Sequence, residues 1–158
     1  MAHPGMTPKG IEYAHEAASK AYDDQMQWID ALDTKAGILM AADGVIVSLV
    51  LTADSVLTRA PILVAVVITI ALFISLVMAL ISFSTRAYET APDIERLLQQ
   101  MQHLDDGGLK WIALEGLSNA LEVNESKVDR KSGYLFLSAM GLLLAILVFA
   151  FFFVYFLV

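Results

Sequence analysis

The chain has 158 residues, a formal net charge of −7 and no cysteine, and 58% of its residues are hydrophobic. Soluble domains average about 45–50% apolar residues, so this composition is typical of a membrane protein. The acidic balance argues against nonspecific nucleic-acid binding, which needs a basic surface. The lack of cysteine excludes disulfides, thiol catalysis and cysteine metal sites.

The N-terminal segment, residues 1–34, is polar and acidic. Residues 10–32 are rich in Ala, Glu, Lys and Gln and contain no internal Gly or Pro, which favours a helix with a weak apolar stripe. We therefore expect a cytoplasmic amphipathic helix. No helix breaker separates it from the first apolar span, so the two are expected to form one continuous helix.

Residues 35–85 contain two apolar spans, at about 36–53 and 60–85, and predict a transmembrane hairpin. The second span is free of charge and exceeds the roughly 20 residues needed to cross a bilayer. The first span carries Asp43, and a carboxylate at a helix centre costs about 2.5–3.5 kcal/mol on insertion scales. One interpretation places Asp43 near the inner interface, paired with Arg130 or Lys131. The other makes it part of an ion or proton pathway.

Residues 86–131 are predicted to form a cytoplasmic helical hairpin. A cap-like start at residues 90–93 precedes an amphipathic stretch at 94–104, residues 105–108 carry breakers, and a second helix is expected over 109–131. Residues 132–158 are free of charge and form the third span. The fold class is thus an all-α membrane protein, with three transmembrane helices and cytoplasmic helical extensions packed as a bundle.

The distribution of basic residues predicts the orientation in the membrane. Six Lys and Arg residues lie in 86–131, whereas Arg59 alone lies between the first two spans. Lys and Arg accumulate on the cytoplasmic side. We expect a cytoplasmic N-terminus and a C-terminus at the outer face.

Small residues recur at four-residue spacing in the second and third spans, where they allow helices to approach closely. Packing within one chain and packing between copies explain them equally well. These candidate helix-packing residues are Ala71, Ser75, Ala79, Gly141 and Ala145.

The sequence contains no catalytic motif and predicts neither a catalytic nor a metal site. Nucleophile-elbow, zinc-protease, phosphate-loop and dinucleotide-binding patterns are all missing. The three histidines are scattered over polar segments. A non-enzymatic protein is therefore expected.

Two charged blocks flank the membrane spans and carry a family resemblance. The first, at residues 28–39, contains Asp30 and Asp33 on one helix face, followed by Lys35. The second, at residues 124–134, leads into the last span. Together with the spacing of the spans, they make most of residues 15–155 resemble the Pycsar membrane-effector family.

The resemblance implies a bacterial antiphage effector of the inner membrane, and we expect a protein of this size to act as a homo-oligomer. It further implies that a partner nucleotide cyclase makes a cyclic mononucleotide, and that the effector responds by impairing the membrane. No other cofactor is expected. The alternatives are a small oligomeric channel or transporter-like protein and a membrane-anchoring adaptor subunit. Candidate ligand-binding or coupling residues are Asp30, Asp33, Lys35, Lys127, Arg130 and Lys131.

Overall fold

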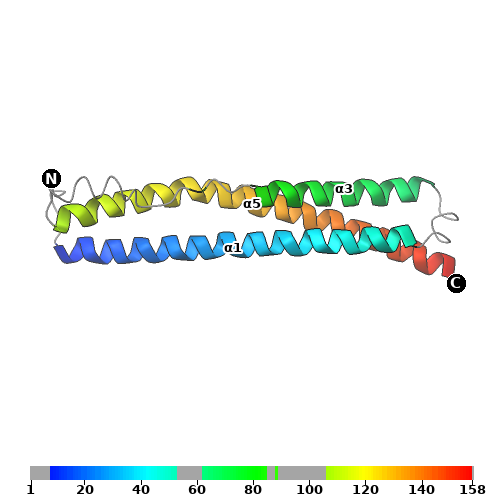
Figure 1. The fold of residues 1–158 in the computed structure, drawn as a ribbon, viewed down its shortest axis with the longest axis horizontal. Helices are drawn as coiled ribbons and strands as arrows, with labels where there is room; N and C mark the ends of the chain where they lie inside the picture. The colour runs from blue at the N-terminus through cyan, green and yellow to red at the C-terminus, as the bar shows by residue number, and fades with distance from the viewer. Residues whose placement is uncertain (1–7, 53–61, 85–87, 89–105, 158) are drawn as a thin grey trace. The chain divides into compact units, whose positions relative to one another are not determined.

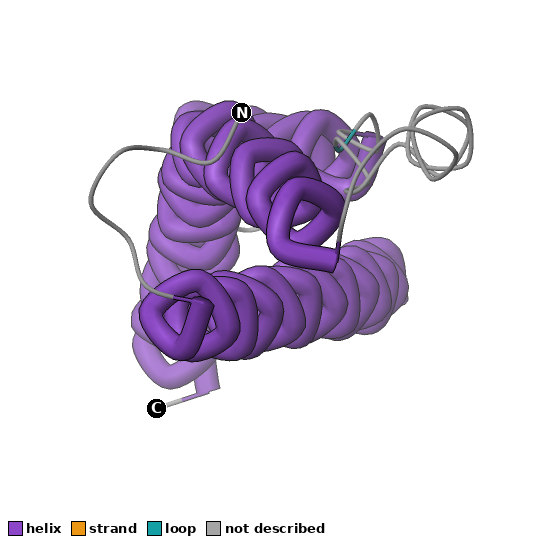
Figure 2. The backbone as a smooth tube through the Cα atoms, turned by 90° about the vertical axis from the view of Figure 1, so that its left-hand side faces the viewer, coloured by secondary structure: helices purple, strands orange, loops and turns teal. Residues whose placement is uncertain are grey.

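The computed structural model describes residues 8–52, 62–84, 88 and 106–157, and all of these except Tyr88 are helical. The helices are α1 (Pro8–Thr52), α3 (Ile62–Ser84) and α5 (Asp106–Leu157) (Figure 1). Each is long and apolar enough to cross a membrane. Figure 2 shows helix and no strand in these described segments. The predicted class, an all-α membrane protein with three spans, is confirmed.

Two of the helices are much longer than a bilayer requires. α1 has 45 residues and α5 has 52, whereas about 20 residues cross the hydrocarbon core. The expected continuity of the N-terminal helix with the first span is confirmed. α5 likewise continues through Gly133 without a break. The predicted helix at residues 94–104 lies outside the described residues.

One predicted helix boundary differs from the structure. The glycines Gly107 and Gly108 were expected to lie in the breaker segment before a helix at 109, but α5 already begins at Asp106. The first turn of a helix tolerates such residues, because its backbone N–H groups have no intrahelical partner in any case. Two glycines next to a helix start therefore do not fix its first residue, and the predicted boundary is a few residues too late.

The chain divides into two compact units. The polar unit comprises Met1–Asp30 and Ala87–Val128, and the membrane unit comprises Ala31–Arg86 and Asp129–Val158. α1 and α5 each contribute residues to both units, whereas α3 belongs to the membrane unit.

In the polar unit, α1 and α5 pack along apolar stripes. Glu12 Oε1 lies 3.6 Å from Lys110 Nζ, and Gln25 Nε2 donates a hydrogen bond of 3.1 Å to the backbone oxygen of Leu121. Glu12 precedes Gln25 on α1, and their partners follow the same order on α5, so the two helices run parallel. Among the described residues of the unit, the buried apolar ones are Ile11, Ile29, Ala113, Leu117 and Ala120.

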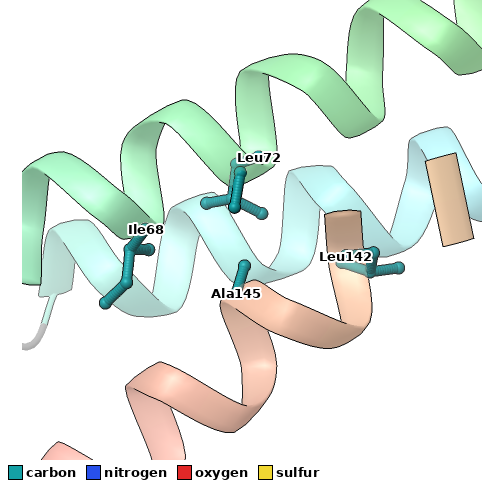
Figure 3. Close-up of a cluster of buried hydrophobic side chains, with 5 residues drawn as sticks. Ile68, Leu72, Leu142 and Ala145 are labelled. Atoms are coloured by element: carbon teal, nitrogen blue, oxygen red, sulfur yellow. The ribbon is translucent and has the colours of Figure 1, made fainter. Parts of the chain in front are cut away.

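In the membrane unit, α3 runs antiparallel to the other two helices (Figure 1). Its core contains Ile68, Leu72, Leu142 and Ala145 (Figure 3). The outer surface is strongly apolar, with Ile62, Phe73 and Phe151 among many exposed large side chains. Such a surface is unfavourable in water and suited to lipid, which agrees with the membrane assignment.

Candidate functional site

The described residues of the membrane unit form two buried polar sites, and the first is an ion pair. Lys131 on α5 is 0% exposed, and its Nζ lies 2.6 Å from Oδ1 of Asp33 on α1. Ser82 on α3 donates a hydrogen bond of 3.3 Å to the backbone oxygen of Lys131. All three helices are thus joined at this site, which we call the ion-pair site.

The ion-pair site combines an enclosed ammonium group with a partly exposed carboxylate. The side chain of Asp33 is 30% exposed, so water still reaches it. An enclosed ammonium group is tolerated only next to an opposite charge, because removing it from water is costly. The contact between Asp33 and Lys131 therefore fixes the relative positions of α1 and α5 in the membrane unit.

The second polar site contains Asp43, Ser75 and Ser138, one from each helix. Ser75 Oγ donates a hydrogen bond of 2.9 Å to Asp43 Oδ2, and Ser75 Oγ lies 3.2 Å from Ser138 Oγ. Asp43 is 2% exposed, and both serines are fully buried. We call these three residues the central polar site.

The central polar site lies deep in the membrane span. Asp43 follows Asp33 by ten residues and precedes the end of α1 at Thr52 by nine. At 1.5 Å per residue these separations are about 15 and 14 Å, close to half of a hydrocarbon core of about 30 Å. The carboxylate is therefore near the middle of the bilayer.

The structure gives Asp43 a different polar partner from the one named in the first interpretation. That interpretation placed Asp43 near the inner interface, paired with Arg130 or Lys131, but the structure pairs Lys131 with Asp33 and gives Asp43 the hydroxyl of Ser75. The separation along α1 explains the difference. A lysine held at the level of Asp33 would have to span about 15 Å along the helix axis to reach Asp43, which is beyond the length of its side chain.

Small residues make the close approach of α3 and α5 possible. A Cβ atom on Gly141 would lie 3.0 Å from the backbone oxygen of Ala71 and 3.3 Å from Cβ of Ser75. Ala79 and Ala145 are fully buried. The small faces of the two spans thus meet inside one chain, which brings Ser138 within hydrogen-bonding distance of Ser75.

The remaining candidate residues are more accessible. Asp30, Lys35 and Arg130 are exposed, and Lys127 is partly buried. Lys35 borders a groove of about 410 Å³ in the membrane unit, which is otherwise lined mainly by apolar residues such as Leu39 and Phe136. Of the six charged candidates, the ion-pair site unites Asp33 and Lys131.

The sequence analysis did not single out several polar contributors, among them Ser82, Ser138 and Gln25. Ser82 joins the ion-pair site through a single hydroxyl, and Gln25 binds Leu121 in the polar unit. Gln25 borders a groove of about 610 Å³ together with Trp28 and the acidic side chains of Asp24, Glu122 and Glu125. Single serines in apolar spans and glutamines in polar helices are common. Residue type alone therefore could not distinguish these positions from others without a structural role.

A comparison with protein-family models found a match to the Pycsar effector protein domain over residues 17–157. The chain belongs to the Pycsar effector family. The match includes α1 from Ala17 onward and the whole of α3 and α5. It confirms the resemblance drawn from the charged blocks, and it implies that the protein is a bacterial antiphage effector.

Neither the curated proteins nor the solved structures include a significant match to the chain. In the described part of this Pycsar effector, no group of three or more His, Asp or Glu side chains is placed to hold a metal ion.

Proposed function

We propose that this Pycsar effector impairs the inner membrane of an infected bacterium when a partner cyclase produces a cyclic pyrimidine nucleotide. The observation that supports this function is the family match, which extends across both the polar and the apolar segments of the chain. The three helices capable of spanning a membrane provide the means of acting on the bilayer. The protein acts without catalysis, as a membrane component.

The shared helices offer a route for the signal. α1 and α5 continue from the polar unit into the membrane unit without a break in helical structure. A ligand that alters the packing of these helices in the polar unit would therefore act on elements that also form the membrane bundle. The two polar sites of the membrane unit are the points at which that bundle would rearrange.

The nucleotide is anionic and needs a basic contact. The groove beside Trp28 has an acidic border and is unsuited to a phosphate. Lys131 is enclosed against Asp33. The accessible candidates that remain are Lys35 and Arg130 of the membrane unit and Lys127 of the polar unit.

A single chain is too thin to enclose a wide aqueous path, because its three spans pack directly on a core of side chains. We therefore propose a homo-oligomer as the active form. The exposed apolar faces of the spans are available for contact between copies as well as for contact with lipid.

A cellular assay tests the proposal. The effector is expressed with an active cyclase or with a catalytically inactive cyclase variant, and entry of a membrane-impermeant dye is followed after phage infection. We expect dye to enter only with the active cyclase and to do so before phage release. Intact membranes in both strains, despite equal effector levels, would refute the function.

A further inference from the structure

The central polar site has an unused acceptor atom. Asp43 Oδ2 accepts the hydrogen bond from Ser75, but Asp43 Oδ1 is buried and has no hydrogen-bond partner among the described residues. A buried polar atom without a partner usually indicates an unseen water or ion or a functional role. We propose that Asp43, Ser75 and Ser138 form an intramembrane binding site for a sodium ion.

The hydrogen bonds leave lone pairs free for a cation. Each serine hydroxyl has one proton to donate. The proton of Ser75 is used toward Asp43, so the contact between the two hydroxyls is donated by Ser138. Ser138 thus donates its proton to Ser75, and Ser75 donates its proton to Asp43. Both hydroxyl oxygens keep at least one free lone pair, and Asp43 Oδ1 accepts no hydrogen bond from the described residues, so all three oxygens can act as ligands.

The charge of the site requires compensation. An isolated carboxylate at this depth is unfavourable, and no ion pair in the described part of the membrane unit includes Asp43. A single carboxylate contributes one negative charge, which one monovalent cation neutralises. Calcium sites use six to eight oxygens, with several carboxylates among them, so the residues present do not fit a divalent ion.

The spacing brings three oxygen-bearing side chains together. Ser75 Oγ lies 2.9 Å from Asp43 Oδ2 and 3.2 Å from Ser138 Oγ. Asp43 also borders a groove of about 300 Å³ whose lining, apart from Asp43 and Thr69, is apolar. That lining gives water few hydrogen-bond partners, so Asp43, Ser75 and Ser138 are the ligands that the site supplies.

Binding of radioactive sodium to the purified full-length protein in nanodiscs tests the site. Choline chloride holds the ionic strength constant. We expect saturable binding that unlabelled sodium displaces and that potassium at equal concentration displaces poorly. Asp43→Asn keeps the shape and the acceptor for Ser75 but removes the charge, and it should abolish saturable binding. Ser138→Ala should weaken binding about tenfold.

Ser84→Ala is the matched control, because Ser84 is an exposed serine on the same helix as Ser75. It should bind sodium as the wild type does. Thermal unfolding in choline chloride verifies that each variant is folded. The proposal is overturned if the wild type shows no saturable binding, or if Asp43→Asn binds equally well. Stabilisation of the wild type by acid alone, with no effect of sodium, would likewise overturn it and identify a proton as the occupant.

Discussion

At the scale of single residues, the polar groups of the membrane unit determine how its helices are placed. In a bilayer, apolar contacts between helices are similar in free energy to contacts with lipid, so they do little to determine which helix faces meet. The pair of Asp33 with Lys131 and the hydrogen bonds of Ser75 have no equivalent in lipid. These few contacts therefore distinguish the observed packing from alternatives that bury the same apolar surface.

The first prediction concerns the ion-pair site. Asp33→Asn removes the carboxylate that lies 2.6 Å from the enclosed ammonium of Lys131, and removing one partner of a buried pair costs about 3–5 kcal/mol. Because Asp33 is partly exposed, we expect the lower end of that range and a clear fall in Tm in detergent. The double variant Asp33→Asn with Lys131→Met should recover part of the loss.

The control for this cycle is Asp23→Asn, which changes an exposed aspartate of α1. It should leave Tm nearly unchanged, since isolated surface charges contribute about 0–1 kcal/mol. Equal Tm values for Asp33→Asn and the wild type would show that the ion pair does not hold the helices.

The second prediction concerns the central polar site. Asp43→Leu removes a costly carboxylate from the middle of a span, so expression and membrane insertion should be preserved. Membrane damage in cells should fall, because the polar contact between α1 and α3 is lost. Dye entry after infection measures the effect, and Ala41→Leu at an exposed position of α1 is the control. A more stable and fully active Asp43→Leu would exclude Asp43 from the mechanism.

The residues show where sequence reasoning was sufficient and where it was not. The charged blocks identified Asp33 and Lys131 as important but did not pair them with each other. Their contact depends on the register of α1 against α5, which no local pattern encodes. Asp43 was recognised as unusual because of its apolar neighbours, but its partner lies 32 positions away on another helix.

At the scale of helices, continuity was predictable because it follows from local composition. α1 contains no proline after its first residue, and α5 contains none. The glycines of α5 did not interrupt it, since a glycine in a helix costs only about 1 kcal/mol relative to alanine. The faces on which the helices meet were harder to choose, because the small residues fitted packing within a chain and packing between copies equally.

The third prediction tests the close approach of α3 and α5. Gly141→Leu places side-chain atoms against the backbone of α3, which cannot move aside without separating the helices. Overpacking of this kind costs about 1–3 kcal/mol. We expect a lower Tm and loss of membrane damage in cells.

Gly133→Leu is the matched control on the same helix, since a Cβ at Gly133 meets nothing within 4 Å. It should retain or slightly raise Tm, because leucine favours helix more than glycine by about 1 kcal/mol. If Gly141→Leu behaves like Gly133→Leu, the small faces do not govern the packing of α3 on α5.

At the scale of the whole molecule, the distribution of charge predicts the orientation in the membrane. The six basic residues between the second and third spans favour a cytoplasmic position for that segment. Reporter fusions at Met1 and Val158 should therefore report the cytoplasm and the outer face, respectively. Reporters on the same side of the membrane would show that one of the three spans is assigned incorrectly.

The central claim is that the protein impairs a membrane in response to a cyclic pyrimidine nucleotide, and ion flux from liposomes tests it most directly. The purified effector is reconstituted, and flux is recorded with a cyclic pyrimidine nucleotide, a cyclic purine nucleotide or no addition. We expect flux to rise with the cyclic pyrimidine nucleotide and to stay near background otherwise. Flux that is absent in all three conditions, or equal in all three, would contradict the account.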